Sequence, residues 1–410
     1  MELIAIALRN VFRNKRRSIL NIIALSLATA LMVLGLGWVE GYHTYVYRAM
    51  QNFESGEVQL IPKGYLDEGR RMPLDINLPG YAALKEELKA MPGIREATGR
   101  IDFALRLSNR AESIYLIGRA IDPASEANTT VLADYIEAGS YLGGEAGGIL
   151  IGKELANRMN VGPGDTVYVV AQDRYGVENF ADIRIAGIFH YGFPPIDKNV
   201  VFLDLSAAME LLDMKDRVTR VVMRLEPPLS PAEGTARLSA QELPGEVYSW
   251  KKFAQATVSA VEADSNTFYL MLVVLYLLIV LGLLNSMSMS VHERTREIGT
   301  LKAIGMKRRS VVLMLMAESG WLALIAALIA IMVSLPLIWY LGSVGIDISA
   351  QMPEEIPVPF GEQFYADFKA RHFLISIAVA SMSALIGTLR PAKKAAGLVV
   401  ADAMRGGGLG

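Results

Sequence analysis

The 410-residue sequence contains no cysteine and only four histidines, at positions 43, 190, 292 and 372. The absence of cysteine excludes disulfide bonds, thiolate metal sites and cysteine nucleophiles. The histidines lack the spacing of metal ligands, so no metal site is expected. Charged residues make up 20% of the chain, whereas 52% is hydrophobic and the mean hydropathy is +0.32. This composition predicts membrane-spanning segments.

Enzyme motifs are missing as well. No segment matches the glycine-rich phosphate loop that an ATPase needs. His292 and Glu293 begin like a zinc-protease motif, but Arg296 stands where the second histidine is required. Ser249 to Lys252 fits Ser-x-x-Lys without its companion Lys-Thr-Gly motif, and Gly-x-Ser-x-Gly is absent. We therefore expect no enzyme activity, no cofactor bound by this chain and no nucleic-acid partner, since the basic residues flank apolar segments.

Four apolar segments are long enough to cross the roughly 30 Å hydrocarbon core as helices: 18–39, 268–289, 311–341 and 373–389. The first has 22 residues without a formal charge, which exceeds the usual apolar region of a signal peptide, so a retained anchor is predicted. In the third, Pro336 follows the apolar run 311–335 and should kink or end the helix. The fourth is the shortest, with 17 residues.

Charge sets the orientation. Segments 1–17, 290–310 and 390–410 together carry 15 basic and 4 acidic residues. Lys and Arg mark the cytoplasmic side, so both termini are expected in the cytoplasm. Segment 1–17 is then a cytoplasmic amphipathic helix and 390–410 a cytoplasmic tail. Segments 40–267 and 342–372 are expected on the other side of the inner (cytoplasmic) membrane.

Segment 40–267 alternates short β-type runs with amphipathic helical runs, which predicts an α+β extracytoplasmic domain. Expected strands are 103–107, 113–117, 166–170, 183–189, 200–203 and 218–225; expected helices are 81–91, 153–159, 206–212 and 231–238. Apolar stripes next to the first two spans indicate a paired helical stalk, or helices that merely pack beneath the domain. The stalk residues are Trp38, Tyr42, Tyr45, Phe53, Phe253 and Val261.

Segment 290–310 contains a short amphipathic helix, with Ile298, Leu301 and Ile304 at helical spacing. It lies on the membrane surface or docks into a partner, and its mixed charge favours the partner. The charged residues are Glu293, Arg294, Arg296, Glu297 and Lys302. In the third span, Glu318 is expected to be a near-interface structural carboxylate that pairs with a base from the cytoplasmic side.

Small residues in the first two spans are spaced for close helix contact and are candidates for a permease dimer interface or substrate cavity. They are Ser26, Thr29, Gly35, Gly37, Gly282, Ser286 and Ser290.

Three segments carry a resemblance to a known family. They are 7–17 (ALRNVFRNKRR), 293–305 (ERTREIGTLKAIG) and 391–396 (PAKKAA). The chain resembles the four-span ABC transporter permeases typified by FtsX, MacB and the lipoprotein-releasing pair LolC/LolE. Segments 151–156, 161–165, 185–189 and 200–204 are most similar to the lipoprotein-releasing branch, whereas 285–290 and the Arg-Glu-Ile-Gly wording are more similar to MacB. Residues 400–405 lack the proline that family members usually carry there.

The resemblance implies a polytopic α-helical membrane protein with four transmembrane helices plus an α+β, MacB-like periplasmic core domain. Glu293 to Gly305 would form the coupling helix that fits a separate ATPase. Implied partners are two copies of that ATPase, which binds ATP and Mg, a second permease (the same chain or a paralogue), membrane lipid, a lipoprotein cargo and a periplasmic carrier. Alternatives are a MacB-like exporter of peptides or drugs with an adaptor and outer-membrane channel, and an FtsX-like regulator of a cell-wall hydrolase.

Overall fold

The computed structural model describes residues 2–13, 15–68, 71–143, 147–192, 194–347, 363–367 and 369–399. The chain divides into two compact units. The helical unit comprises Met1–Thr44, Ala260–Asp347 and Gln363–Gly410, and the α+β unit comprises Tyr45–Ser259 and Ile348–Glu362. Most of the predicted loop 342–372 and the predicted tail beyond residue 399 lie outside the described residues.

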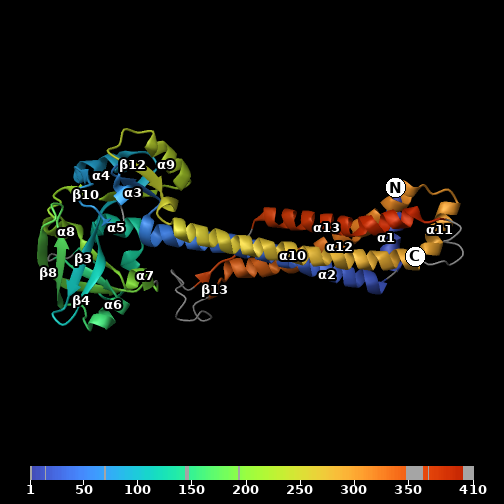
Figure 1. Ribbon diagram of the computed structural model, residues 1–410, viewed down its shortest axis with the longest axis horizontal. Helices are drawn as coiled ribbons and strands as arrows, with labels where there is room; N and C mark the ends of the chain where they lie inside the picture. Colours follow the sequence, from blue (N-terminus) through green and yellow to red (C-terminus); the bar gives the residue numbers. More distant parts are fainter. Residues whose placement is uncertain are drawn as a thin grey trace. The chain divides into compact units, whose positions relative to one another are not determined.

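Long helices make up the helical unit (Figure 1). Four of the described helices are long and apolar enough to cross a membrane, as the sequence predicts. The bounds are α1 Glu2–Arg13, α2 Lys15–Met50, α10 Gln255–Glu293, α11 Thr295–Ala303, α12 Arg308–Ser343 and α13 Ala370–Gly397. The first residues of α10 and the last residues of α2 belong to the α+β unit.

Several helix ends differ from the sequence prediction. Helix α12 continues past Pro336, so the proline does not end it. Membrane helices tolerate proline because neighbouring groups and local adjustments satisfy the freed backbone carbonyl. Helix α13 likewise extends beyond the predicted 373–389 at both ends and includes Pro391. Phe253, predicted on a helical stripe, precedes α10 and follows a 3-10 turn, η4 Trp250–Lys252.

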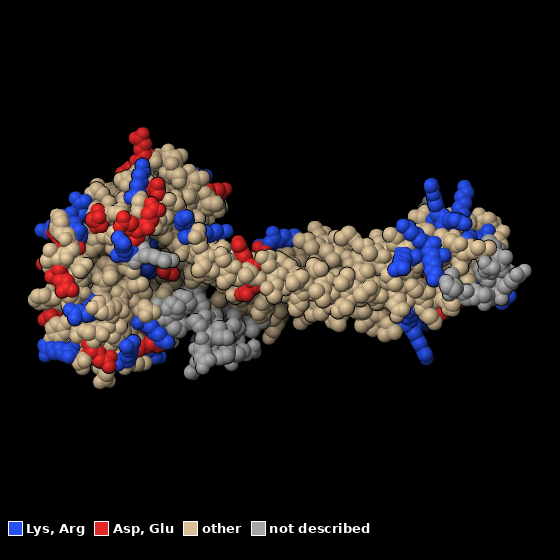
Figure 2. Space-filling model, in the orientation of Figure 1, with Lys and Arg blue, Asp and Glu red and all other residues tan. Residues whose placement is uncertain are grey.

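The helices of this unit pack around small side chains. One core cluster contains Leu25 of α2, Tyr276 of α10, Ala326 of α12 and Ala384 of α13. Alanines allow the backbones of α12 and α13 to approach closely. The outer surface stays apolar, and Leu270, Leu277, Leu278 and Leu281 of α10 are more than half exposed. Figure 2 shows no charged side chain over the central stretch of these helices on the visible face. An apolar surface of this kind suits lipid contact.

The α+β unit is built on a ten-stranded sheet in the order β12-β1-β11-β3-β4-β9-β6-β8-β5. Strand β7 pairs with both β3 and β8, so β3, β4, β9, β6, β8 and β7 form a closed ring of pairings, a small barrel. The bounds are β1 Val58–Ile61, β3 Ile94–Ser108, β4 Ser113–Ile121, β5 Ile136–Gly139, β6 Ile149–Gly152, β7 Thr166–Gln172, β8 Glu178–Phe189, β9 Val200–Asp204, β11 Arg220–Leu225 and β12 Glu246–Ser249. Strands β2 Leu78–Pro79 and β10 Arg217–Val218 form a separate pair, as do β13 Ile346–Asp347 and β14 Gln363–Phe364 of the helical unit.

Alternation along the barrel strands separates an apolar interior from an outer face. Leu105 pairs with Leu116 and with Ala171, and all three are buried. In the next row, Tyr115 of β4 pairs with Arg106 of β3, Arg106 with Val170 of β7, and Val170 with Phe180 of β8. Tyr115 is 82% exposed and Phe180 80%. The side-chain period of two explains both rows.

Short helices connect these strands. Their bounds are α3 Tyr65–Glu68, α4 Tyr81–Ala90, α5 Pro123–Thr129, α6 Lys153–Met159, α7 Pro194–Asp197, α8 Leu205–Leu211 and α9 Pro231–Ser239, with a 3-10 turn, η3, at Leu132–Tyr135. Helix α9 begins as predicted, because Ser230 and Glu233 form a reciprocal capping box with proline at the first position. The predicted strands all lie within observed strands except 218–225, which Thr219 divides between β10 and β11.

Candidate functional site around helix α11

Helix α11 is a short connector between two membrane-length helices. It follows α10 after Arg294, which occupies its N-cap position. After α11 ends, Gly305 adopts φ +103 and starts the turn into α12. A side chain is strained in this left-handed conformation, so glycine suits the position. Within the predicted coupling segment, Thr295–Ala303 therefore form a separate short helix between α10 and α12.

A buried ion pair fixes the start of α11. Arg294 Nη1 lies 3.0 Å and 3.2 Å from the two carboxylate oxygens of Glu318 in α12. The side chains are 6% and 2% exposed. Arg294 Nη2 also donates to the carbonyl oxygen of Asn10 in α1, at 3.3 Å. Arg294 thereby links α11 with α12 and α1, and it is the base that Glu318 was expected to find.

Other polar contacts tie the same region together. Arg17 donates to Ser290 at 2.7 Å and pairs with Glu293 at 3.2 Å. On the exposed side, Arg13 of α1 pairs with Glu297 of α11. Figure 2 shows basic side chains gathered at the end of the helices where Figure 1 labels α1 and α11.

Lys302 connects the end of α11 to α13. Its Nζ donates to the carbonyl oxygen of Ala396 at 2.9 Å and also to that of Leu398. These carbonyls lie at the C-terminus of α13, where a positive charge is favourable. Partial burial, together with nearby Arg308, lowers the pKa of Lys302.

The predicted coupling residues divide between two faces of α11. Ile298 is 2% exposed and packs with Val311 and Leu315 of α12 and with Ala395 of α13. Arg294 and Ile298 are therefore used inside this chain. The exposed coupling residues, which together with Ile304 we call the free face, are Glu293, Arg296, Glu297 and Gly305. Leu301 and Lys302 are half-buried.

Ile304, predicted on the same apolar stripe as Ile298 and Leu301, is the most exposed apolar side chain of this connector, at 79%. Helix α11 ends at Ala303, so Ile304 occupies the C-cap position and does not continue the buried stripe. Beside α11, a cavity of about 430 Å³ is lined by Ile6, Arg13, Glu297, Leu301 and Met314. The exposed residues of the connector thus offer a charged surface with one large apolar residue, Ile304, next to a cavity that several apolar side chains line.

The small residues predicted to pair two permeases are mostly occupied within this chain. Ser26 and Thr29 are buried. Gly35 faces Phe268, and a Cβ atom there would lie 2.0 Å from the ring. Asp367 donates its backbone N–H to the carbonyl oxygen of Gly37 at 3.1 Å.

In α10, Ser286 receives a hydrogen bond from Asn21 at 2.8 Å, and Ser290 receives the one from Arg17. Gly282 is exposed, and a Cβ atom there would meet none of the described atoms within 4 Å. A role of this set in permease pairing stays a prediction, and Gly282 is its most accessible member.

The predicted stalk residues fall in both units. Within the helical unit, Trp38 packs against Phe364 with tilted rings whose centroids are 4.4 Å apart, Tyr42 is half-buried and Val261 is 2% exposed. Beside them, His43 Nε2 of α2 lies 2.5 Å from Ser265 Oγ of α10, so these two helices run side by side there.

Within the α+β unit, Tyr45 is half-buried and Phe53 is buried. Phe253 packs edge-on against Tyr248.

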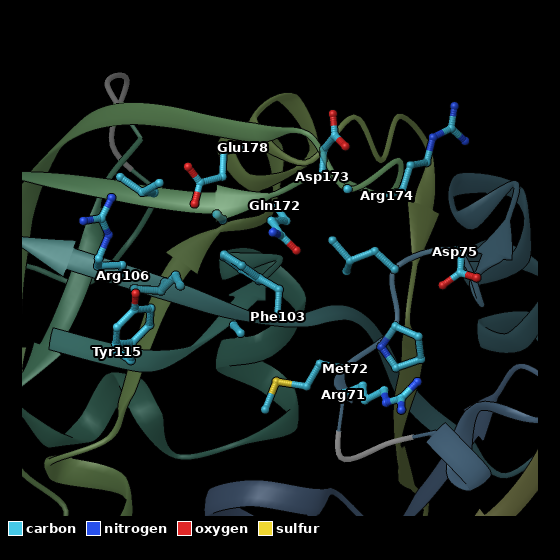
Figure 3. A pocket seen from close by; sticks show the side chains of 17 residues that line it. Arg71, Met72, Asp75, Phe103, Arg106, Tyr115, Gln172, Asp173, Arg174 and Glu178 are labelled. Atoms are coloured by element: carbon cyan, nitrogen blue, oxygen red, sulfur yellow. The ribbon is translucent and has the colours of Figure 1, made fainter.

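A second cavity, of about 460 Å³, lies in the α+β unit and is lined by residues of β3, the end of β7 and the segment 71–75 (Figure 3). Phe103, Arg106 and Tyr115 line one part of it, and Gln172 and Glu178 line another. The charges are mixed and no nucleophile stands beside a base among these residues. Across the described residues, no group of three or more potential metal ligands occurs.

Comparison with protein families matches two segments of the chain. The MacB-like periplasmic core domain matches residues 18–241, and the FtsX-like permease C-terminal matches residues 269–400. The second match includes α11 and the ion pair between Arg294 and Glu318.

Individual proteins and one solved structure are also similar to this chain. The lipoprotein-releasing system transmembrane protein LolC of Xylella fastidiosa is 24% identical over 301 residues, which is 70% of this chain and 72% of LolC. The macrolide export ATP-binding/permease protein MacB of Chlorobium luteolum is 35% identical over 128 residues, which is 30% of this chain and 16% of MacB. The periplasmic region of MacB from Actinobacillus actinomycetemcomitans aligns with 13% identity and a TM-score of 0.37, over 49% of this chain and 91% of that structure.

The match to the periplasmic core domain covers more than half of the chain, and the permease match begins in the second membrane-length helix. With four such helices and an α+β unit between the first two, the chain belongs to the family of FtsX-like ABC transporter permeases that carry a MacB-like periplasmic core domain.

Proposed function

We propose that this chain is the permease subunit of an ABC complex that extracts lipoproteins from the inner membrane and passes them to a periplasmic carrier. Both termini lie in the cytoplasm, and the α+β unit lies in the periplasm. A separate ATPase, present in two copies, binds ATP and Mg. Because that ATPase hydrolyses the ATP, no catalytic residue is required in this chain. The permease pairs with a second copy or a paralogue.

The observation that carries this proposal is the construction of α11. A connector between two membrane helices needs no buried ion pair, yet Arg294 joins α11 to both α12 and α1, and Lys302 joins it to α13. Breaking such a buried pair is costly, so the contacts favour movement of α11 together with its neighbours. The exposed residues Arg296 and Ile304 remain free for a partner. A displacement of α11 by the ATPase would thus be passed to the membrane helices.

The choice of cargo is supported by the relatives. The LolC match spans most of both chains, whereas the more identical MacB match is confined to 30% of this chain. A MacB-like exporter of peptides or drugs, with an adaptor and an outer-membrane channel, is the alternative. An FtsX-like regulator, in which no cargo moves, is a second one.

Release from proteoliposomes tests the proposal. Vesicles would contain this chain, its partner permease and ATPase and a labelled triacylated lipoprotein, with a soluble carrier outside. We expect ATP-dependent release of the lipoprotein, and no release of the same protein attached through a transmembrane helix.

Ile304→Asp places a charge on the free face of α11 and should abolish release, whereas the matched control Ile304→Val should retain it. Because Ile304 is exposed, its substitution should leave the fold intact, whereas a charge at half-buried Leu301 would also disturb packing. If ATP is hydrolysed while the lipoprotein stays in the membrane, the extraction proposal fails and export or regulation takes its place.

A further inference from the structure

The basic residues at the α11 end of the helical unit differ in whether they have a counter-charge. Arg13 of α1 pairs with Glu297 of α11, and Arg17 of α2 pairs with Glu293 of α10. The basic residues at the start of α12 and in the last two turns of α13 form no ion pair with any described residue. This second group is a charged surface that no internal contact explains.

Six exposed side chains make up this second group, and we call it the cationic patch. Its members are Lys307, Arg308, Arg309, Arg390, Lys393 and Lys394. The surrounding stretches 302–317 and 388–399 contain no aspartate or glutamate. Nearly all charged side chains visible at this end of the helical unit are basic (Figure 2). Because like charges on one surface repel one another, the patch favours the binding of an anion.

The two halves of the patch lie on neighbouring helices. Val311 at the start of α12 packs with Ala392 and Ala395 near the end of α13 in one core cluster. At the end of α13, Lys302 of α11 donates to the carbonyl oxygen of Ala396 at 2.9 Å. The carbonyl end of a helix is negative, and here Lys302 satisfies it instead of the patch. The patch cations therefore remain available to a ligand.

Exposed apolar side chains continue from the patch along both helices. On α13, Ile386, Arg390 and Lys394 follow one another at intervals of four residues, so they share one face. On α12, Arg309 and Leu313 have the same spacing. Ile386 is 55% exposed and Leu313 is 61% exposed. Each helix thus passes, within one turn, from an apolar surface suited to lipid to a cation at its end.

Phospholipid matches both parts of this surface. Its acyl chains suit the exposed apolar side chains, and an anionic headgroup suits cations placed where a membrane helix leaves the hydrocarbon. The general preference for basic residues on one side of a membrane explains the sign of the charge. It does not explain why six cations gather on two packed helices without a carboxylate. An acidic protein would match the cations but not the apolar side chains that continue from them.

We propose that the cationic patch is a binding site for anionic phospholipid. The headgroup phosphates contact the cations of α12 and α13, and the acyl chains lie along the faces that contain Leu313 and Ile386. This inference goes beyond the proposed function and requires only that the four long helices span the membrane. It depends on neither the cargo nor the ATPase.

Quenching of a fluorescent label by brominated lipid tests the site in the full chain, because the cysteine-free sequence allows labelling of a single introduced cysteine. Ile386→Cys reports on lipid beside the patch. Leu374→Cys is the matched control, because Leu374 is 69% exposed at the other end of α13. The basic residues there, Lys369 and Arg371, both pair with Glu40. The vesicles would contain equal amounts of phosphatidylglycerol and phosphatidylcholine, with bromine on the acyl chains of one or the other.

At Ile386→Cys we expect phosphatidylglycerol to be preferred over phosphatidylcholine by about fivefold, the effect of a single cation near an anionic surface. At Leu374→Cys we expect the two lipids to quench the label equally. Added salt should reduce the preference at Ile386→Cys, because exposed charges are screened.

The variant Arg390→Gln/Lys393→Gln/Lys394→Gln removes the α13 half of the patch. All three positions are exposed, so the fold should be retained. In the Ile386→Cys background we expect this variant to lower the preference for phosphatidylglycerol to about twofold or less, since the nearest cations are gone.

The control Arg9→Gln/Lys15→Gln/Arg16→Gln removes three exposed basic residues from α1 and α2 at the same end of the unit. It changes the net charge by the same amount and should leave the preference at Ile386→Cys unchanged. Thermal unfolding verifies that both variants are folded, and if one is not, the wild-type comparison of the two labels decides the matter.

Equal quenching by the two lipids at Ile386→Cys, or an equal loss of preference in the patch and control variants, would overturn the proposal. Inorganic phosphate should leave the preference unchanged when compared with chloride at the same ionic strength. A selective loss in phosphate would show that the patch holds the free ion instead of lipid and would also overturn it. Because neither ATP nor lipoprotein is present, failure of this site is distinct from failure of lipoprotein release.

Discussion

Arg294 and Glu318 carry charge at a place where burial makes charge expensive. Each side chain is nearly inaccessible, and each compensates the other. The contact joins residues 24 positions apart in sequence and brings α11 against α12. Removing one partner leaves the other charged and unpaired in an apolar bundle.

Stability measurements on three variants test the importance of this pair. Arg294→Met should lower the free energy of unfolding by about 3–5 kcal/mol because Glu318 is left unpaired. Arg294→Met/Glu318→Met removes both charges and should recover most of that loss. Arg13→Met, which breaks an exposed pair, should cost no more than about 1 kcal/mol. Denaturation of the full chain in detergent would provide these values, and a double variant no more stable than Arg294→Met would contradict this explanation.

Asp102 gives the α+β unit a specific response to acid. Burial alone would raise the pKa of Asp102, but Arg119 and Arg220 more than offset it and lower the pKa to about 2. The unfolded value is about 4, so the stabilisation is complete above that pH and is lost as the pH falls toward 2. The loss should be about 2 kcal/mol.

Urea unfolding at a series of pH values would measure it. The difference in stability between wild type and Asp102→Asn should shrink between pH 4 and pH 2, since other carboxylates contribute equally to both proteins. A difference that stays constant over this range would show that Asp102 keeps an ordinary pKa.

Among the elements, α2 shows how sequence patterns can identify residues without identifying their neighbours. Gly35 and Gly37 suggested contact with another helix of a second permease. In the structure, the carbonyl oxygen of Gly37 accepts a hydrogen bond from the backbone N–H of Asp367. Gly41 lies against Tyr365 and Ala366 of the same chain. Small residues indicate that a backbone comes close, but which backbone depends on the tertiary fold.

A pair of glycine substitutions separates these two uses. At Gly41 a Cβ atom would lie 2.4 Å from the carbonyl oxygen of Tyr365, a backbone atom that cannot rotate away. Gly41→Ala should therefore destabilise the helical unit by about 1–3 kcal/mol. Gly282→Ala is the matched control, because a Cβ atom there meets no described atom within 4 Å. Thermal denaturation would measure the stability of both variants. An equal loss of stability in the two would contradict the assignment of Gly41 to an internal contact.

The elements that sequence predicted best have local causes. Long apolar runs predicted the four membrane helices, alternation predicted β7, and Ser230 with Pro231 predicted the start of α9. Closure of the barrel depends on the pairing of β3 with β7, in which Leu105 meets Ala171. Nothing in either strand specifies this non-local register on its own. The hydrogen bond from Arg100 of β3 to the carbonyl oxygen of Glu54, which follows α2, likewise joins residues far apart in the sequence.

At the scale of the whole molecule, four membrane-length helices and a barrel-containing α+β unit share one chain in which no nucleotide-binding loop is present. The proposed division of labour follows from these features. A partner ATPase acts on the face of α11 that contains Arg296 and Ile304, and the buried contacts of Arg294 and Lys302 carry the displacement into the bundle.

Transmission across the membrane can be measured without knowledge of the cargo. The full complex would be placed in vesicles with a single Ser259→Cys in this chain and with ATP supplied only on the cytoplasmic side. A membrane-impermeant maleimide outside the vesicles would report the accessibility of that cysteine. We expect the labelling rate to change when ATP is hydrolysed and to stop responding in the Ile304→Asp background. An unchanged rate during continued hydrolysis would contradict the central claim that work done on the cytoplasmic side reaches the periplasmic unit.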